Sequence, residues 1–113
     1  TLSFLGGQRV IPRYNVMGVA KAALEMSAKY LAADLAPRGI RVNVLSPGPV
    51  KTAAAKGIRD FAELMKAFVE KTPSGRHIET EEIARHAAFW LSKKSDGATG
   101  QTVFIDGGFS IMG

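Results

Sequence analysis

Small and apolar residues dominate the first long segment of the chain, from Ile11 to Ala36. Pro12 suits the first turn of a helix, where its missing backbone donor costs nothing, and Pro37 ends the segment. The intervening alanines and leucines predict one long helix. Its small side chains would let a second helix, from its own sheet layer or from a partner subunit, approach closely. High helix propensity alone would explain the same residues equally well.

Two shorter segments have the composition and alternation of β-strands. Residues 40–45 follow Gly39 and end in a turn rich in proline and glycine, residues 46–49. Residues 101–105 follow a second glycine-containing turn and end at residues 106–108, which read Asp-Gly-Gly. Both segments are predicted to be strands.

A second helical pattern begins after Asp60, a residue type that can cap a helix N-terminus. Its apolar side chains fall at positions i, i+3, i+4 and i+7, namely Phe61, Leu64, Met65 and Phe68. That spacing places all four on one face and predicts a short amphipathic helix.

Thr80 is predicted to cap a further helix, because acidic residues follow it and Lys93 and Lys94 come at the end. Both ends suit the helix dipole. The predicted apolar stripe of this helix consists of Ile83, Ala87, Trp90 and Leu91.

The predicted order, helix-strand-helix-helix-strand, is that of an alternating α/β protein with parallel strands. A chain of 113 residues allows one structural unit. Two strands cannot complete a doubly wound sheet, so residues 1–113 are expected to form the C-terminal half of a Rossmann-like domain. The chain also starts in an apolar run without Met, which favours a longer parent protein.

Composition excludes several classes of protein. There is no cysteine and there are only two histidines, so neither a disulfide framework nor a zinc site is predicted, and no other metal site is expected. No signal-peptide or membrane-spanning pattern is present, which allows a cytoplasmic location. The net charge of +5 favours an acidic partner or anionic ligand, unless a missing half carries compensating acids. Basic residues do not alternate with aromatic ones, so nucleic acid binding is not expected.

Tyr14 and Lys21 are the candidate catalytic pair. Seven positions on a helix fall 20° short of two turns and rise about 10.5 Å, so both side chains would border one groove with a ligand between them. Tyr30 lies nine positions past Lys21, on the opposite side of the helix. From these residues alone, an amphipathic side chain at a surface rim remains an alternative for Tyr14.

Three segments carry a resemblance to a known family: residues 14–21 (YNVMGVAK), 43–52 (NVLSPGPVKT) and 106–110 (DGGFS). Together they resemble the NADH-dependent enoyl-acyl carrier protein reductases of the short-chain dehydrogenase/reductase superfamily. Six residues separate Tyr14 from Lys21, whereas three are usual in other short-chain dehydrogenases. The resemblance implies reduction of the trans-2 double bond of enoyl thioesters in fatty acid biosynthesis.

The same resemblance implies roles for individual residues. Tyr14 would hydrogen-bond the thioester carbonyl, and Lys21 would hold the ribose hydroxyls of NADH. The implied cofactor-binding residues are Lys21, Pro49, Val50, Lys51, Thr52, Ala53 and Ala54. The implied substrate-binding residues are Phe4, Tyr14, Met17, Ala54, Ala55, Ile58, Phe61 and Leu64. For Met17, Phe61 and Leu64 a plain core role is equally consistent with the sequence.

One position departs from many family members: Phe4 stands where they carry a second tyrosine.

The resemblance also implies a homo-oligomer, a dimer or tetramer, and an acidic acyl carrier protein docking near basic residues such as Arg9, Lys51, Lys56 or Arg59. A ketone or alcohol dehydrogenase and an inactive truncated fragment remain alternatives. The glycine-rich turn of a dinucleotide site is absent, so this chain alone is expected to bind NADH poorly.

Overall fold

The computed structural model describes residues 1–52 and 60–112. Its main elements, apart from short 3-10 turns, are α1 (Asn15–Leu35), β1 (Val44–Pro47), α2 (Phe61–Lys71), α3 (Thr80–Leu91) and β2 (Thr102–Ile105). The predicted order of helices and strands is therefore confirmed.

The strands are parallel, and β1 lies at the centre of the sheet. It pairs with β2 in a register that aligns Val44 with Thr102 and Pro47 with Ile105. On its other side, Leu2 forms a parallel bridge to Leu45. This third extended segment was not predicted, because three residues carry too little pattern to reveal a long-range pairing.

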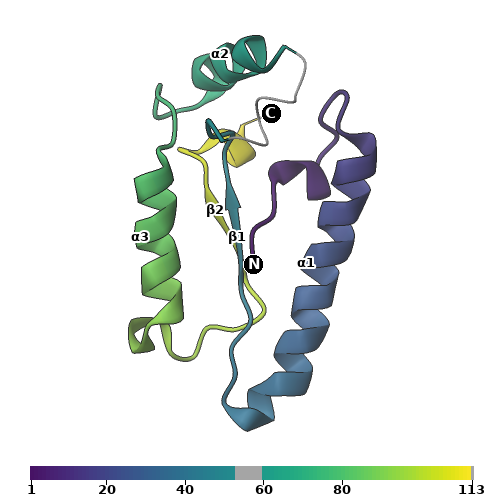
Figure 1. Cartoon of the computed structure of the whole chain (residues 1–113), viewed down its shortest axis with the longest axis vertical. Helices are drawn as coiled ribbons and strands as arrows, with labels where there is room; N and C mark the ends of the chain where they lie inside the picture. Colours follow the sequence, from purple (N-terminus) through teal and green to yellow (C-terminus); the bar gives the residue numbers. More distant parts are fainter. Residues whose placement is uncertain (53–59, 113) are drawn as a thin grey trace.

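The helices are arranged around this layer as in a doubly wound fold. In Figure 1, α1 and α3 flank the strands on opposite sides, and α2 lies beyond the end at which both strands terminate. Tyr14 immediately precedes α1, so it lies at the same end of the molecule as α2. In open α/β sheets, ligands bind at the carboxyl ends of the strands, which makes this end the place to look for a site.

Successive side chains of a strand point to opposite faces of the sheet, so the core has one part on each face. Leu45 and Ile105 belong to an apolar cluster with Ile83 of α3, and Trp90 packs against that cluster. Val44, the residue before Leu45, must point to the other face, where it is fully buried. β1 therefore contributes buried side chains to both faces of the sheet.

The long helix begins later than the sequence predicted. It starts at Asn15 instead of Ile11, because residues 11–13 form a turn in which Arg13 adopts a left-handed conformation with φ 64°. A non-glycine residue at positive φ cannot lie inside a helix. Pro12 therefore belongs to this turn and not to the first helical turn.

The first strand is displaced toward its carboxyl end, to Val44–Pro47, relative to the predicted residues 40–45. Residues 42 and 43 still face the loop before β2, but they bind it partly through side chains. The Val42 N–H donates to Oγ1 of Thr99, and Nδ2 of Asn43 donates to the Ala98 carbonyl.

The third helix differs from prediction at both ends. Glu79, not Thr80, is the N-cap, and it forms a reciprocal capping box with Glu82. Leu91 was predicted to join the apolar stripe, but it is 85% exposed because the helix ends there. Ile83 is buried as expected.

Asp60 precedes α2 as predicted, but its side chain does not cap the helix. It has φ 60°, and Oδ2 lies 2.7 Å from Nη1 of Arg13, the other described non-glycine residue at positive φ. This exposed ion pair ties the start of α2 to the residue before Tyr14.

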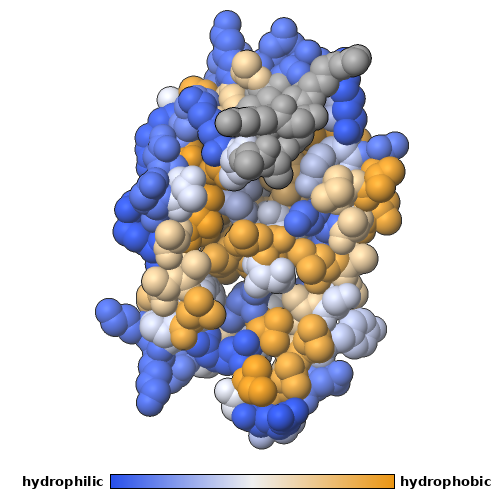
Figure 2. Space-filling view, in the orientation of Figure 1, coloured by the Kyte–Doolittle hydropathy of each residue, from blue (hydrophilic) through white to orange (hydrophobic). Residues whose placement is uncertain are grey.

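Apolar side chains are also exposed on the surface of the molecule, in addition to those packed inside the fold. Figure 2 shows them as orange patches through the middle of the face turned to the viewer. In the described residues, no helix is both long and apolar enough to cross a bilayer.

Candidate active site

Tyr14 is fixed at the junction between a turn and a long helix. Its N–H donates to the Ile11 carbonyl (3.1 Å), and its own carbonyl accepts from the N–H of Gly18 (2.6 Å). The backbone of Tyr14 is therefore held on both sides.

The ring of Tyr14 is half-buried in a close-packed setting. Its edge meets Phe4 with 5.1 Å between ring centroids and an interplanar angle of 70°. It also lies directly over Gly6, where an added Cβ would come within 2.8 Å of its Cε1 atom. Burial raises the pKa of Tyr14 above its usual 10.0, so the phenol is a neutral hydrogen-bond donor near pH 7.

Lys21 lies further along α1 and reaches back to the same N-terminal segment. Its Nζ donates to the carbonyl of Leu2 at 3.0 Å. An ammonium group has three donors, so this bond leaves capacity for a second polar ligand. Tyr14 and Lys21 thus both contact residues 2–6, the segment that contains the third predicted residue, Phe4.

A buried carboxylate that the sequence analysis missed lies one turn beyond Lys21. Glu25 accepts hydrogen bonds from Oγ of Ser3 (2.5 Å) and from Nε2 of Gln8 (2.6 Å). Its i+4 spacing from Lys21 could have placed it on the same helix face. Its hydrogen-bond partners, however, are 17 and 22 positions away in the sequence and could not be inferred from that spacing.

The predicted cofactor-binding segment follows β1 directly. Pro49 is buried, and Val50 packs its side chain against the apolar core, so its backbone is the part that can face a ligand. Lys51 and Thr52 are exposed. Ala53 and Ala54 lie outside the described residues.

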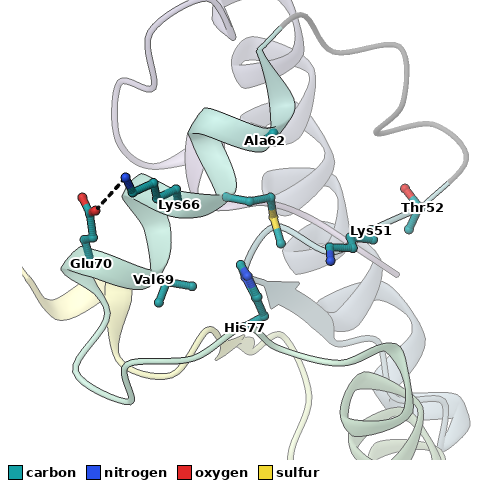
Figure 3. Close-up of a pocket in the computed structure, with 8 residues that line it drawn as sticks. Lys51, Thr52, Ala62, Lys66, Val69, Glu70 and His77 are labelled. Carbon is teal, nitrogen blue, oxygen red and sulfur yellow. Dashed lines mark ion pairs between the residues drawn. The ribbon is translucent and has the colours of Figure 1, made fainter.

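Lys51 and Thr52 border a cavity of about 710 Å³ beside α2. Its lining residues are Lys51, Thr52, Ala62, Met65, Lys66, Val69, Glu70 and His77. Figure 3 shows the His77 ring directed into the space between α2 and Lys51. The Nδ1 atom of His77 is buried with no hydrogen-bond partner among the described residues. Tyr14 and Lys21 are not among the lining residues, so this cavity is distinct from the surface between them.

The predicted substrate-binding residues divide into three groups. Phe4 contacts Tyr14 directly. Met17 is 48% exposed and Leu64 is half-buried, so neither is a full core residue. The remaining positions lie outside the described residues or have a side chain that does: Ala54, Ala55, Ile58 and Phe61.

This donor set suits a nicotinamide nucleotide. A lysine ammonium with spare donors can bind a ribose diol, and the segment that ends β1 offers backbone groups, a hydroxyl and a second ammonium for polar and phosphate groups. A neutral phenol at the end of the parallel strands can stabilise negative charge on a substrate oxygen. The fold and these donor groups are of the kind found in nucleotide-binding proteins of the α/β class.

Comparison with known families agrees with this class. Residues 1–110 match the model of the enoyl-(acyl carrier protein) reductase family. The chain therefore belongs to that family. It is 48% identical over its full length to enoyl-acyl-carrier-protein reductase (NADH) FabI of Bacillus cereus, and 48% identical over 111 residues to the FabI protein of Escherichia coli.

Solved structures give the same result. The Bacillus cereus reductase, in a complex with NADP+ and indole naphthyridinone, superposes with a TM-score of 0.97 at 48% identity over the whole chain. The reductase of Plasmodium berghei, crystallised with triclosan, superposes with a TM-score of 0.91 at 38% identity over 98% of the chain. The chain spans 44% of the Bacillus cereus relative and 39% of the Plasmodium structure.

Proposed function

We propose that this chain is the C-terminal part of a longer NADH-dependent enoyl-acyl carrier protein reductase that acts in fatty acid biosynthesis. The observation that carries the proposal is the joint placement of Tyr14 and Lys21 against residues 2–6. The family match and the Tyr-Lys spacing support the substrate class. NADH, when bound, would supply a hydride to the β-carbon of the enoyl thioester.

Tyr14 stabilises the charge that develops during this reaction. Hydride addition at the β-carbon moves electron density onto the thioester oxygen, and the phenol donates a hydrogen bond to it. The raised pKa of Tyr14 keeps the proton on the phenol at neutral pH. Phe4 supplies no hydroxyl, so Tyr14 is the donor that this segment directs at the carbonyl.

Lys21 orients the cofactor through its ribose hydroxyls, and the residues after β1 hold the remaining polar groups. In this proposal the backbone of Val50 faces the nicotinamide amide, while Lys51 and the Thr52 hydroxyl approach the pyrophosphate. Pro49 fixes the direction in which this segment leaves the strand. Ala53 and Ala54 complete the cofactor-binding set.

The acyl chain is proposed to lie along Phe4, Met17 and Leu64. Ala54, Ala55, Ile58 and Phe61 complete the proposed substrate-binding set. An acidic acyl carrier protein would dock nearby, attracted by the positive net charge of the chain. A cytoplasmic location follows from the same function.

A second subunit is proposed to cover the outer side of α1. Val16, Val19, Met26 and Tyr30 recur at helical spacing and are each more than half exposed. An exposed apolar stripe of this kind is typical of an interface between subunits, and it supports a homodimer or homotetramer.

The decisive experiment compares substrates and variants in the full-length protein. We expect NADH oxidation with a crotonyl thioester and not with an acetoacetyl thioester. Tyr14→Phe should lower kcat by about 100-fold or more, the usual cost of removing an oxyanion donor. Tyr30→Phe is the matched control and should keep wild-type kcat, because Tyr30 lies on the side of α1 opposite Lys21.

Other outcomes identify the alternatives. Turnover of the acetoacetyl thioester alone would assign a ketone reductase, and no turnover of either substrate would assign an inactive product. Micromolar binding of NADH to residues 1–113 alone, measured by calorimetry, would contradict the view that the dinucleotide site needs further polypeptide.

A further inference from the structure

Glu25 is a buried carboxylate that the reaction as derived above does not use. It is only 7% exposed, on the face of α1 that also carries Lys21. Isolation of a carboxylate from water is costly unless hydrogen bonds compensate for the lost hydration. The partners of Glu25 should therefore reveal what the residue holds in place.

Those partners lie at the two ends of one short segment. Ser3 donates to Oε1 and Gln8 donates to Oε2, so the carboxylate spans residues 3–8. The segment also approaches the helix closely: a Cβ at Gly7 would lie 3.0 Å from the Ala22 nitrogen and 3.1 Å from Oε1 of Glu25. Hydrogen bonds to a charged acceptor are stronger than neutral ones, so Glu25 clamps this segment to α1.

The clamped segment is the surface on which the catalytic pair rests. Phe4 meets the edge of the Tyr14 ring, and Gly6 lies directly beneath that ring. The carbonyl that accepts from Lys21 belongs to Leu2, the residue before Ser3. A shift of residues 2–8 would therefore displace the phenol and the ammonium together.

We propose that Glu25 is a positioning residue, which fixes residues 3–8 against α1 and thereby sets the relative placement of Tyr14 and Lys21. The kinetic part of this inference rests on the proposed function, whereas the placement of Tyr14 does not. A mutation far from the reacting atoms can cost about 100-fold in rate if it displaces the catalytic groups by about 1 Å.

Four variants of the full-length protein test the proposal. Glu25→Ala removes both hydrogen bonds, Ser3→Ala and Gln8→Ala remove one each, and Glu25→Gln keeps the shape and one acceptor. Ala32→Gly is the matched control, because it loosens the same buried face of α1 two turns further on, away from residues 3–8.

Two readouts separate positioning from simple loss of stability. We expect kcat for a crotonyl thioester to fall about 10- to 100-fold in Glu25→Ala, to fall less in the two single-bond variants, and to stay within about threefold in Glu25→Gln. Ala32→Gly should lower the melting temperature but keep wild-type kcat. In tyrosine-labelled protein, the NMR-titrated pKa of Tyr14 should move from its raised value toward 10.0 in Glu25→Ala, because the ring becomes more exposed.

Several results would overturn the proposal. It fails if Glu25→Ala folds, keeps kcat within twofold of wild type and retains the raised pKa of Tyr14. It also fails if kcat falls as far in Ala32→Gly as in Glu25→Ala. If Glu25→Ala does not fold, the proposal fails when Ser3→Ala and Gln8→Ala both leave kcat and the pKa of Tyr14 unchanged. If the wild-type protein reduces no thioester, the proposed function fails, and the Tyr14 titration alone decides the role of Glu25.

Discussion

The ring of Tyr14 meets the ring of Phe4 edge-on, 5.1 Å between centroids, at a position where many relatives are expected to carry a second tyrosine. Edge-to-face pairs of this kind contribute about 0.5–1.5 kcal/mol beyond the area they bury. Phe4 thus supports the ring of Tyr14 through packing and offers no hydroxyl of its own.

This contact predicts different results for two substitutions at Phe4. Phe4→Ala should lower kcat by about tenfold in the full-length protein, because the Tyr14 ring loses one of its walls. Phe4→Tyr keeps the wall and should stay within about threefold of wild-type kcat. Steady-state kinetics with a crotonyl thioester measures both, and equal activity of the alanine variant and wild type would show that the contact has no role in positioning.

Gly6 is predicted to be intolerant of any side chain. A Cβ there would overlap Cδ1 and come within 2.8 Å of Cε1 of Tyr14, so Gly6→Ala must displace the ring. We expect a loss of about 10- to 100-fold in kcat with a smaller change in the KM for NADH. Gly97→Ala is the control: φ is 87° there, and no atom of the described residues lies within 4 Å of an added Cβ, so the change should cost stability without affecting kcat.

Acid should weaken the N-terminus of α3. Hydrogen bonds from the Arg76 guanidinium, and a further one from the Glu79 N–H, lower the pKa of Glu82 from 4.5 to about 2. Because the ionised form is favoured in the folded state, its stabilisation is present above pH 4.5 and is lost as the pH falls toward 2. Urea unfolding of the full-length protein across this range measures the effect. Glu82→Gln should flatten this part of the pH profile, and Glu81→Gln should leave it unchanged.

The exposed stripe on α1 predicts dependence of assembly on Val19, which is 73% exposed. Val19→Glu would place a charge in the proposed interface, and the dissociation constant of the oligomer should rise at least about tenfold. Lys29→Glu, on the same helix but off the stripe, should leave assembly intact. Analytical ultracentrifugation of the full-length protein compares the two. Unchanged assembly in Val19→Glu would remove α1 from the interface.

Local patterns in the sequence predicted the elements well, and their ends less well. Alternation and helical spacing located both strands and all three main helices, because each signal lies within a few neighbouring residues. The start of α1 was wrong because nothing in the sequence signals that Arg13 adopts a left-handed conformation. The exposure of Leu91 was missed because a helical pattern does not show where the helix ends.

The site was predictable only in part, for a related reason. Tyr14 and Lys21 stand close together in one motif, so their spacing alone could suggest a shared ligand. The support beneath them depends on contacts across the fold, such as the pairing of Leu2 with Leu45 and the bonds from Ser3 and Gln8 to Glu25. Local patterns in a single sequence do not reveal which distant residues meet, so these contacts became visible only in three dimensions.

Arg9 contacts the other end of the described chain, and this contact identifies a position for a fluorescent label. Its Nη1 atom donates to the carbonyl of Met112 at 2.6 Å, which brings that residue beside the loop leading into Tyr14. A small fluorophore attached through Met112→Cys would therefore lie beside the loop that leads into Tyr14, and it would replace none of the residues proposed to act in catalysis. Since the chain has no cysteine of its own, this thiol would be the only one it offers for labelling, and the dye could report ligand arrival in real time.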